Sequence, residues 1–215
     1  MKKFAVVISG CGVFDGAEIH EATMTLYAIV KYGGSYEIFA PDIEQHHVIN
    51  HITGEEMSET RNVLVEAARI ARGKIRNLAD FNAEHFDALI LPGGFGVAKN
   101  LSSFAFDGPN CSVDLSVEQA IISMVKRNKP VGALCIAPVI LAKLLKGAIV
   151  TVGNDKSTVD AIEKMGSKHQ VTTHGEIVVD EVLKIVTTPC YMLDANIEQI
   201  ARGSKEVVKQ IMKMV

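Results

Sequence analysis

The sequence of 215 residues has no tryptophan, few aromatic side chains (6%) and no excess of one charge, since its formal net charge is −3. Such a balance gives no electrostatic basis for binding nucleic acid or an anionic membrane. The N-terminal apolar run from Phe4 to Ile8 is shorter than the roughly 7–15 residues of a secretory apolar core, and nothing approaches the roughly 18 apolar residues of a membrane-spanning helix. We therefore expect a cytoplasmic protein that binds neither nucleic acid nor a membrane.

The chain also lacks any closely spaced pair of cysteines of the CxxC type. Its four cysteines are widely separated, at Cys11, Cys111, Cys135 and Cys190. In a reducing compartment this spacing favours free thiols and argues against a disulfide framework or a zinc knuckle.

Motifs for metals and nucleotides are missing as well. The segment EQHHVINH contains His46, His47 and His51, but adjacent histidines in a polar loop usually stay solvated and lack the converging partners of a metal site. The segment SGCGVFDG does not match GxGxxG, so dinucleotide binding is unsupported. We expect no metal and no cofactor.

What the chain does contain is a regular alternation of apolar runs and helical segments. Strands are predicted at 3–9, 36–40, 87–91, 130–134, 176–180 and 183–187, and helices at 18–32, 59–72, 112–126, 136–146, 155–165 and 196–214, with a polar loop at 41–60. This order predicts an α/β fold, a mostly parallel sheet covered by helices on both faces, in a single domain of residues 1–215. Ligands of such folds collect beyond the carboxyl ends of the strands.

One cysteine lies where a predicted strand turns into a predicted helix, in PVGALCIAPVILAKLL. A side chain at such a sharp turn is pushed out above the sheet edge, and small residues such as Gly132, Ala133 and Ala137 let the backbone close tightly. The positive end of the following helix favours the thiolate form of Cys135. Cys135 is therefore a candidate nucleophile, although a single cysteine more often only packs in a core.

Two other strand ends carry groups that suit this nucleophile. The segment ALILPGGFG ends a strand with bare backbone, so the N–H groups of Gly94 and of Ile136 can form an oxyanion hole, although the glycines can also simply make a tight turn. Glu18 and Glu21 are three residues apart at the start of the first helix and share a face. A desolvated carboxyl there would stay protonated and could donate to a thiolate, but acidic residues in a first turn also favour the helix dipole.

Four segments together resemble the ThiJ/PfpI superfamily, relatives of the class I glutamine amidotransferases: GAEIHEA, ALILPGGFGVAKNLS, GALCIAP and VTVGNDKST. The branch called enhancing-lycopene-biosynthesis or sigma cross-reacting protein is the most similar. The resemblance implies a flavodoxin-like fold with Cys135 as nucleophile, Glu21 as its protonated partner, and backbone donors at Gly94 and Ile136. It also implies a homodimer, and activity on glyoxal or methylglyoxal without glutathione or metal.

The chain departs from other branches of that superfamily. Ile136 stands where protease-like members have a histidine after the nucleophile, which argues against a peptidase. His174 and Glu176 have the spacing of an amidotransferase His-x-Glu, but they come before the last predicted strand and not after it, so a glutaminase triad is not expected. Cys190 follows the last predicted strand and can lie near Cys135 at the same sheet edge.

Two functions follow from these residues. The first is a glutathione-independent glyoxalase that converts a small α-oxoaldehyde, such as glyoxal to glycolate, through a hemithioacetal on Cys135. The second is a redox-sensing or regulatory protein, in which Cys135 is oxidised and aldehyde chemistry is incidental. A link of that second function to isoprenoid biosynthesis depends on the name of the resembling branch alone.

Overall fold

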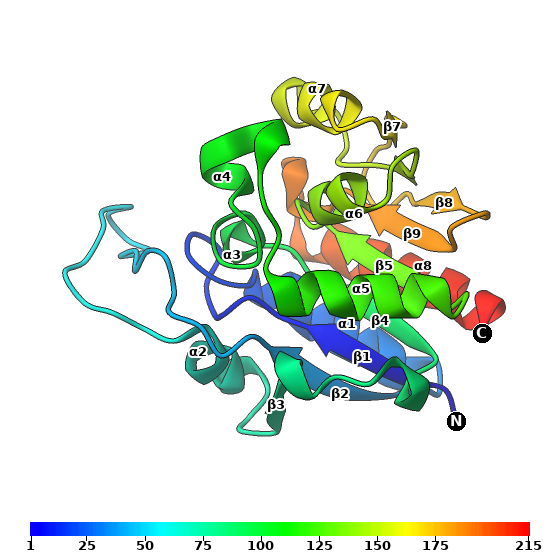
Figure 1. Ribbon diagram of the computed structural model, residues 1–215, viewed down its shortest axis with the longest axis horizontal. Helices are drawn as coiled ribbons and strands as arrows, with labels where there is room; N and C mark the ends of the chain where they lie inside the picture. Colours follow the sequence, from blue (N-terminus) through cyan, green and yellow to red (C-terminus); the bar gives the residue numbers. More distant parts are fainter.

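A computed structural model describes residues 1–215, and its centre is a seven-stranded sheet in the order β3-β2-β1-β4-β5-β9-β8 (Figure 1). The strands are β1 (Lys3–Val7), β2 (Ser35–Ala40), β3 (Ile75–Asn77), β4 (Ala88–Leu91), β5 (Val131–Leu134), β8 (Val178–Asp180) and β9 (Ile185–Thr188). All neighbours in this sheet are parallel except β8, which is antiparallel to β9. The predicted α/β fold is confirmed.

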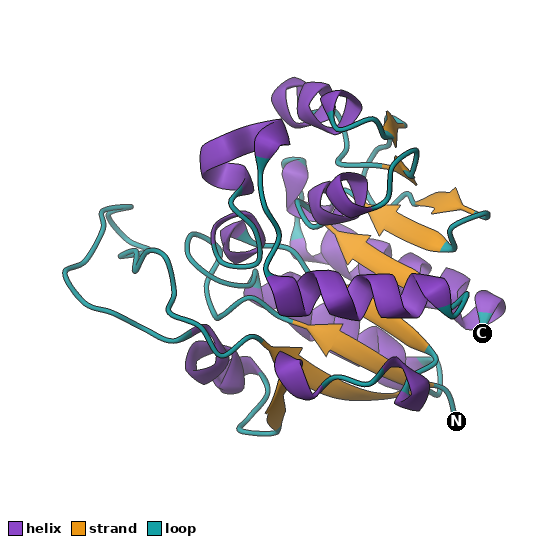
Figure 2. Cartoon of the chain, viewed as in Figure 1, coloured by secondary structure: helices purple, strands orange, loops and turns teal.

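Helices cover both faces of the sheet, as Figures 1 and 2 show. One face carries α1 (Ile19–Lys31), α2 (Val63–Ile70) and α8 (Ile197–Met214), and the other carries α5 (Leu115–Lys126) and α6 (Pro138–Leu144). Successive strand residues point to opposite faces, so Phe4 and Val6 join the core under α1 and α8, while Ala5 and Val7 join the core under α5 and α6. These two cores fix the sheet edge on which β1, β4, β5 and β9 end.

Several short elements are absent from the sequence prediction. They are β3, α3 (Phe95–Lys99), α4 (Phe104–Asp107), a separate pair β6 (Ile149–Val150) and β7 (Lys168–His169), and 3-10 turns at Leu78–Asp80, Ala83–His85, Gly108–Asn110 and Cys190–Met192. The helix predicted at 59–72 is shorter, because the Asn62 side chain accepts the Val65 N–H and α2 starts after this cap. The helix predicted at 155–165 is α7 (Lys156–Lys164).

The polar loop predicted at 41–60 is present and extends over residues 41–62, and Figure 2 shows it projecting beyond the ends of the strands. Its β-pairing is limited to two isolated bridges, between Glu44 and Asn62 and between Ile49 and Glu56. None of the helices combines the length and the apolar character needed to cross a membrane.

Candidate active site

Cys135 follows β5 directly and has a strained backbone, with φ of 60°. This left-handed conformation is unfavourable for residues other than glycine. Its N–H donates to the carbonyl of Thr188 at the end of β9 (2.9 Å), and the Ala137 N–H donates back to the Leu134 carbonyl (2.9 Å), which closes the turn. The predicted sharp turn between strand and helix is therefore present, and it directs the sulfur above the sheet edge.

Glu21 lies in the first turn of α1 and is completely buried. Its Oε2 accepts the N–H of Gly93 (2.9 Å), its Oε1 accepts the N–H of Tyr191 (3.2 Å), and its carboxyl group is hydrogen-bonded to the thiol of Cys135. Glu18 is the N-cap of the same helix, because its Oε2 accepts the Glu21 N–H at 2.7 Å. The structure therefore brings Glu21 and Cys135 together, with Glu18 one turn away as a helix cap.

The environment of Glu21 favours its neutral form. Burial, and then the negative charge of Glu18, raise the pKa of Glu21 to about 8, although the hydrogen bonds that the carboxylate accepts act in the opposite direction. At neutral pH the carboxyl group therefore carries a proton. This agrees with the hypothesis of a protonated partner for the sulfur.

The thiol itself differs from the expectation. Burial, and then negative charge on Glu21, raise the pKa of Cys135 well above its usual range, whereas the N–H groups of Gly94 and Ile136 that bond the sulfur lower it. The side chain is only 7% exposed, so loss of solvation outweighs the end of the short helix α6. The expectation of an independently low thiol pKa is wrong; a thiolate here depends on Glu21 holding a proton.

The two glycines after β4 are required by the close approach of these groups. A Cβ on Gly93 would lie 2.4 Å from the Cβ of Cys135 and 2.7 Å from Oε2 of Glu21. A Cβ on Gly94 would lie 2.3 Å from the backbone nitrogen of Glu18, and Gly94 also has a φ of 102°. Both glycines thus do more than make a turn, because they let backbone N–H groups reach the carboxyl and the sulfur.

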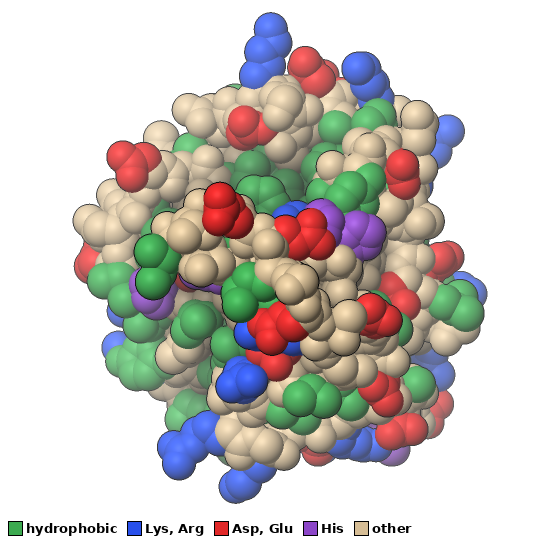
Figure 3. Space-filling view, turned by 90° about the vertical axis from the view of Figure 1, so that its left-hand side faces the viewer, with side chains coloured by type: hydrophobic (Ala, Val, Ile, Leu, Met, Phe, Trp, Pro, Cys, Tyr) green, Lys and Arg blue, Asp and Glu red, His purple; other side chains and the backbone are tan.

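A cavity of about 410 Å³, here called the reactive cavity, opens onto Cys135. Nine of its 12 lining residues are hydrophobic, among them Val13, Phe95, Phe104 and Met192. Figure 3 views the molecule from the side on which the strands end and shows apolar side chains around a hollow. The sulfur is therefore mostly buried yet lies in the wall of an open space.

The remaining predicted residues lie in different surroundings. His174 Nε2 is 2.9 Å from the carbonyl of Asp194, and no histidine is among the residues that line the reactive cavity. Cys190 is 4% exposed and its thiol is free; burial, and then the charge of Glu21, raise its pKa well above the usual range. The charges of Glu21 and Cys135 thus affect the Cys190 thiol, and Cys190 forms no disulfide with Cys135.

Tyr191 is part of the site and was not identified from the sequence. Its N–H bonds Glu21, its hydroxyl is 2.8 Å from Nδ1 of His20, and its side chain lines the reactive cavity. The only signal in the sequence is its position just after β9, at the edge where the other site residues lie. Burial, followed by the charges of Glu18 and Glu21, raises the pKa of the Tyr191 hydroxyl.

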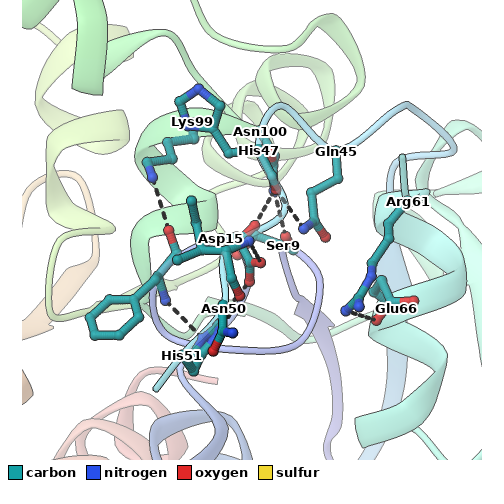
Figure 4. Close-up of polar contacts among 12 residues, drawn as sticks. Ser9, Asp15, Gln45, His47, Asn50, His51, Arg61, Glu66, Lys99 and Asn100 are labelled. Carbon is teal, nitrogen blue, oxygen red and sulfur yellow. Dashed lines mark hydrogen bonds and ion pairs between the residues drawn. The ribbon is translucent and has the colours of Figure 1, made fainter. Parts of the chain in front are cut away.

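A second group of polar side chains fastens the loop of residues 41–62 to the segment after β1 (Figure 4). Asp15 accepts the Ile49 N–H (2.7 Å), and Asn100 donates to the carbonyls of Ser9 (3.0 Å) and Asp15 (2.9 Å). His51 accepts the N–H of Phe14 (3.2 Å).

The other two histidines of this loop make aromatic contacts. The rings of His46 and His47 lie 4.2 Å and 5.8 Å from that of Phe106, while His46 stays exposed and His47 partly exposed, in line with the solvated loop that the sequence predicts. Nowhere in the molecule do three His, Cys, Asp or Glu side chains gather as metal ligands would.

The model of the DJ-1/PfpI family matches residues 11–195, a range that contains Cys135, Glu21 and the glycines between them. The chain belongs to the DJ-1/PfpI family. The resemblance to the ThiJ/PfpI superfamily is thereby confirmed. A solved structure from Ehrlichia chaffeensis, described as an isoprenoid biosynthesis protein with an amidotransferase-like domain, is 33% identical with a TM-score of 0.92, covering 99% of this chain and 100% of the other. Glyoxalase III from Candida albicans shares the fold at 14% identity and a TM-score of 0.62, covering 99% and 97%.

Curated relatives in the DJ-1/PfpI family correct one expectation. The ES1 protein homolog of Rattus norvegicus is 46% identical, covering 99% of this chain and 84% of its own length, and the human glutamine amidotransferase-like class 1 domain-containing protein 3 is 45% identical, covering 99% and 83%. Both are named mitochondrial proteins, which contradicts the expected cytoplasmic location. A short N-terminal apolar run argues only against secretion and does not distinguish between compartments inside a cell.

Proposed function

We propose that this protein is a cofactor-independent glyoxalase, which converts a small α-oxoaldehyde to the 2-hydroxy acid through Cys135. The observation that supports it is the hydrogen bond between Cys135 and a buried carboxyl group whose pKa is raised to about 8, at the wall of an open cavity. A neutral carboxyl beside a sulfur can donate to a thiolate and later exchange protons with the substrate.

The reaction begins when the Cys135 thiolate adds to the aldehyde carbon. The resulting alkoxide accepts a proton from Glu21, giving a hemithioacetal, and the N–H groups of Gly94 and Ile136 beside the sulfur stabilise the oxyanion while it lasts. The Glu21 carboxylate then takes the proton from the sulfur-bound carbon, which gives an enediol, and returns it to the neighbouring carbon. The hydroxyl proton of the hemithioacetal passes to the neighbouring carbonyl oxygen, so the product is a thioester that carries a 2-hydroxy group. One carbon is oxidised and the other reduced, so no external oxidant is needed, and water hydrolyses the thioester to release the acid and the thiol.

The test is production of glycolate from glyoxal by the purified protein without glutathione. Cys135→Ser should abolish it, and Glu21→Ala should lower kcat/KM by about 100-fold or more, the contribution typical of a general acid–base group. Cys11→Ser is the matched control and should retain the activity, because Cys11 does not line the reactive cavity. Equal rates for the wild type and Cys135→Ser would refute the proposal.

A redox-sensing or regulatory role is the second candidate, favoured by the free thiol of Cys135 in the wall of the cavity beside a carboxyl that can hydrogen-bond oxidised sulfur. Mild peroxide would then add two oxygens to Cys135 with negligible aldehyde turnover, which mass spectrometry can detect. The Ehrlichia relative suggests isoprenoid metabolism as the process regulated.

A further inference from the structure

The reactive cavity is large for the smallest α-oxoaldehyde. Its volume is about 410 Å³. Glyoxal, counted as one water-sized volume of about 30 Å³ for each of its heavy atoms, occupies no more than roughly 120 Å³. Most of the cavity would remain filled with water when glyoxal binds to Cys135. The unused space therefore fits a substituent attached to the reacting aldehyde.

The walls indicate that this substituent is apolar. Phe95 is 50% exposed, and Phe104 and Met192 are partly exposed in the same cavity. Covering such apolar surface contributes roughly 25 cal/mol for each Å² removed from water. Thioether and aromatic groups also adapt to rings and branched chains. A hydrocarbon substituent gains this energy, whereas a hydrated sugar does not.

The charges around the cavity disfavour an anion. No lysine or arginine is among the lining residues, and the one charged side chain there is Asp155. Its carboxylate caps α7 by accepting the Thr158 N–H (2.9 Å) and the hydroxyls of Thr158 (2.6 Å) and Ser157 (2.9 Å). These hydrogen bonds, led by that from the Thr158 side chain, lower the pKa of Asp155, so it is negative at neutral pH. A phosphate or carboxylate on the substrate would meet this charge with no cation to balance it.

We propose that the reactive cavity selects neutral α-oxoaldehydes with an aromatic or branched apolar substituent, and discriminates against anionic ones. This inference rests on the proposed function for its substrate class. The preference of the cavity for neutral apolar groups, however, applies to any reagent that attacks the Cys135 sulfur, and this allows the two to be tested separately.

The first experiment measures alkylation of Cys135 by mass spectrometry, using iodoacetate, iodoacetamide and N-benzyl-iodoacetamide, each rate divided by that for cysteine in a short peptide. We expect the normalised rate to be at least about tenfold higher for the benzyl reagent than for iodoacetamide, the discrimination that a hydrophobic pocket gives for a small apolar group. We expect the lowest normalised rate for iodoacetate. Equal normalised rates for the three reagents would overturn the inference, whatever the outcome with glyoxal.

Three variants test whether the side chains that line the reactive cavity cause the preference for the benzyl reagent. Phe95→Ala should reduce the ratio of benzyl reagent to iodoacetamide, whereas Phe106→Ala is the matched control, because Phe106 is about as exposed as Phe95 (48% and 50%) but does not line the cavity. Asp155→Asn keeps an oxygen for the helix cap and removes the charge, so labelling by iodoacetate should rise by about threefold relative to iodoacetamide. If both phenylalanine variants change the ratio equally, the apolar substituent does not bind in the reactive cavity.

The second experiment compares kcat/KM for glyoxal, methylglyoxal, isopropylglyoxal and phenylglyoxal. We expect it to increase in that order, with at least about a tenfold difference between the first and the last. No turnover of any aldehyde, with the alkylation preference intact, would refute the proposed function and leave the selectivity of the cavity standing. If turnover is fastest with glyoxal and alkylation shows no preference, the proposed function stands and the selectivity of the cavity is refuted.

Discussion

Cys135 and Cys11 both follow a parallel strand at the same edge of the sheet, yet their surroundings differ. Cys135 has a left-handed backbone, two N–H donors at its sulfur and a neutral carboxyl beside it. Cys11 lies between flanking glycines and is half-buried; burial, and then the charge of Glu66, raise its pKa. Position at the sheet edge therefore does not by itself determine the surroundings of a thiol. The difference lies in the hydrogen-bonding groups that converge on the sulfur.

The largest expected effect comes from disturbing that convergence without replacing any polar side chain. Gly93→Ala places a methyl group 2.4 Å from the Cβ of Cys135, which must shift. We expect kcat/KM for the aldehyde to fall by about 100-fold or more, because displacements of about 1 Å have effects of this size. Gly33→Ala is the control: nothing lies within 4 Å of its added Cβ, so it should cost only the roughly 1 kcal/mol of its left-handed backbone. Unchanged activity in a folded Gly93→Ala protein would show that the close approach is unimportant.

An intermediate effect is expected on the pH dependence of the two thiols. Below about pH 8, Glu21 and Cys135 each hold a proton. As the pH rises through about 8, the pair loses one of these two protons. When the remaining proton is on the Glu21 carboxyl group, Cys135 is a thiolate. Alkylation of Cys135 should therefore increase with an inflection near pH 8. In Glu21→Gln the amide has no proton to lose, so the inflection should move to higher pH, following the thiol that burial makes a weaker acid.

Cys11 provides the internal control for that measurement. Its peptide is followed in the same digests, and its alkylation profile should be the same in the wild type and in Glu21→Gln, because Glu21 is not among the groups that affect its pKa. An inflection for Cys135 that stays near pH 8 in Glu21→Gln would mean that the carboxyl does not control the sulfur.

The smallest effect is expected at the histidine that resembles an amidotransferase motif. His174 bonds the carbonyl of Asp194 and does not line the reactive cavity. His174→Ala should therefore change the rate of glycolate formation by less than about twofold, whereas loss of a true general base costs at least about 100-fold. A loss of that larger size, in a protein with unchanged melting temperature, would assign His174 to the reaction.

The sequence predicts the sheet and the core of the site well, for physical reasons. Parallel strands buried on both faces are apolar runs, so the strands at 3–9 and 130–134 were found to within two residues at either end. Cys135 directly follows such a run, Gly94 comes three residues after another, and the carboxyl ends of parallel strands lie at one edge of the sheet. Glu21 depends more on the resemblance, because a glutamate in a first turn has a common alternative as a favourable charge at the helix dipole.

Three features cannot be predicted from local sequence patterns. The contact of the Tyr191 N–H with Glu21 depends on the left-handed backbone of Cys190, with φ of 44°. Because this residue is not a glycine, the sequence gives no sign of that conformation. The raised pKa of the Cys135 thiol depends on how tightly the surrounding elements exclude water, and a sequence window does not contain that information. Strands of two residues, such as β6 and β7, are too short to show any periodicity.

The left-handed φ of 60° at Cys135 has a consequence for directed evolution. Glycine adopts this backbone without the penalty of roughly 1–2 kcal/mol that other residues incur. A library selected only for heat resistance should therefore drift toward glycine at position 135, while selection for detoxification of aldehydes should retain cysteine. The two selections therefore favour different residues at position 135, and the residue found there after each selection shows which of the two properties was selected.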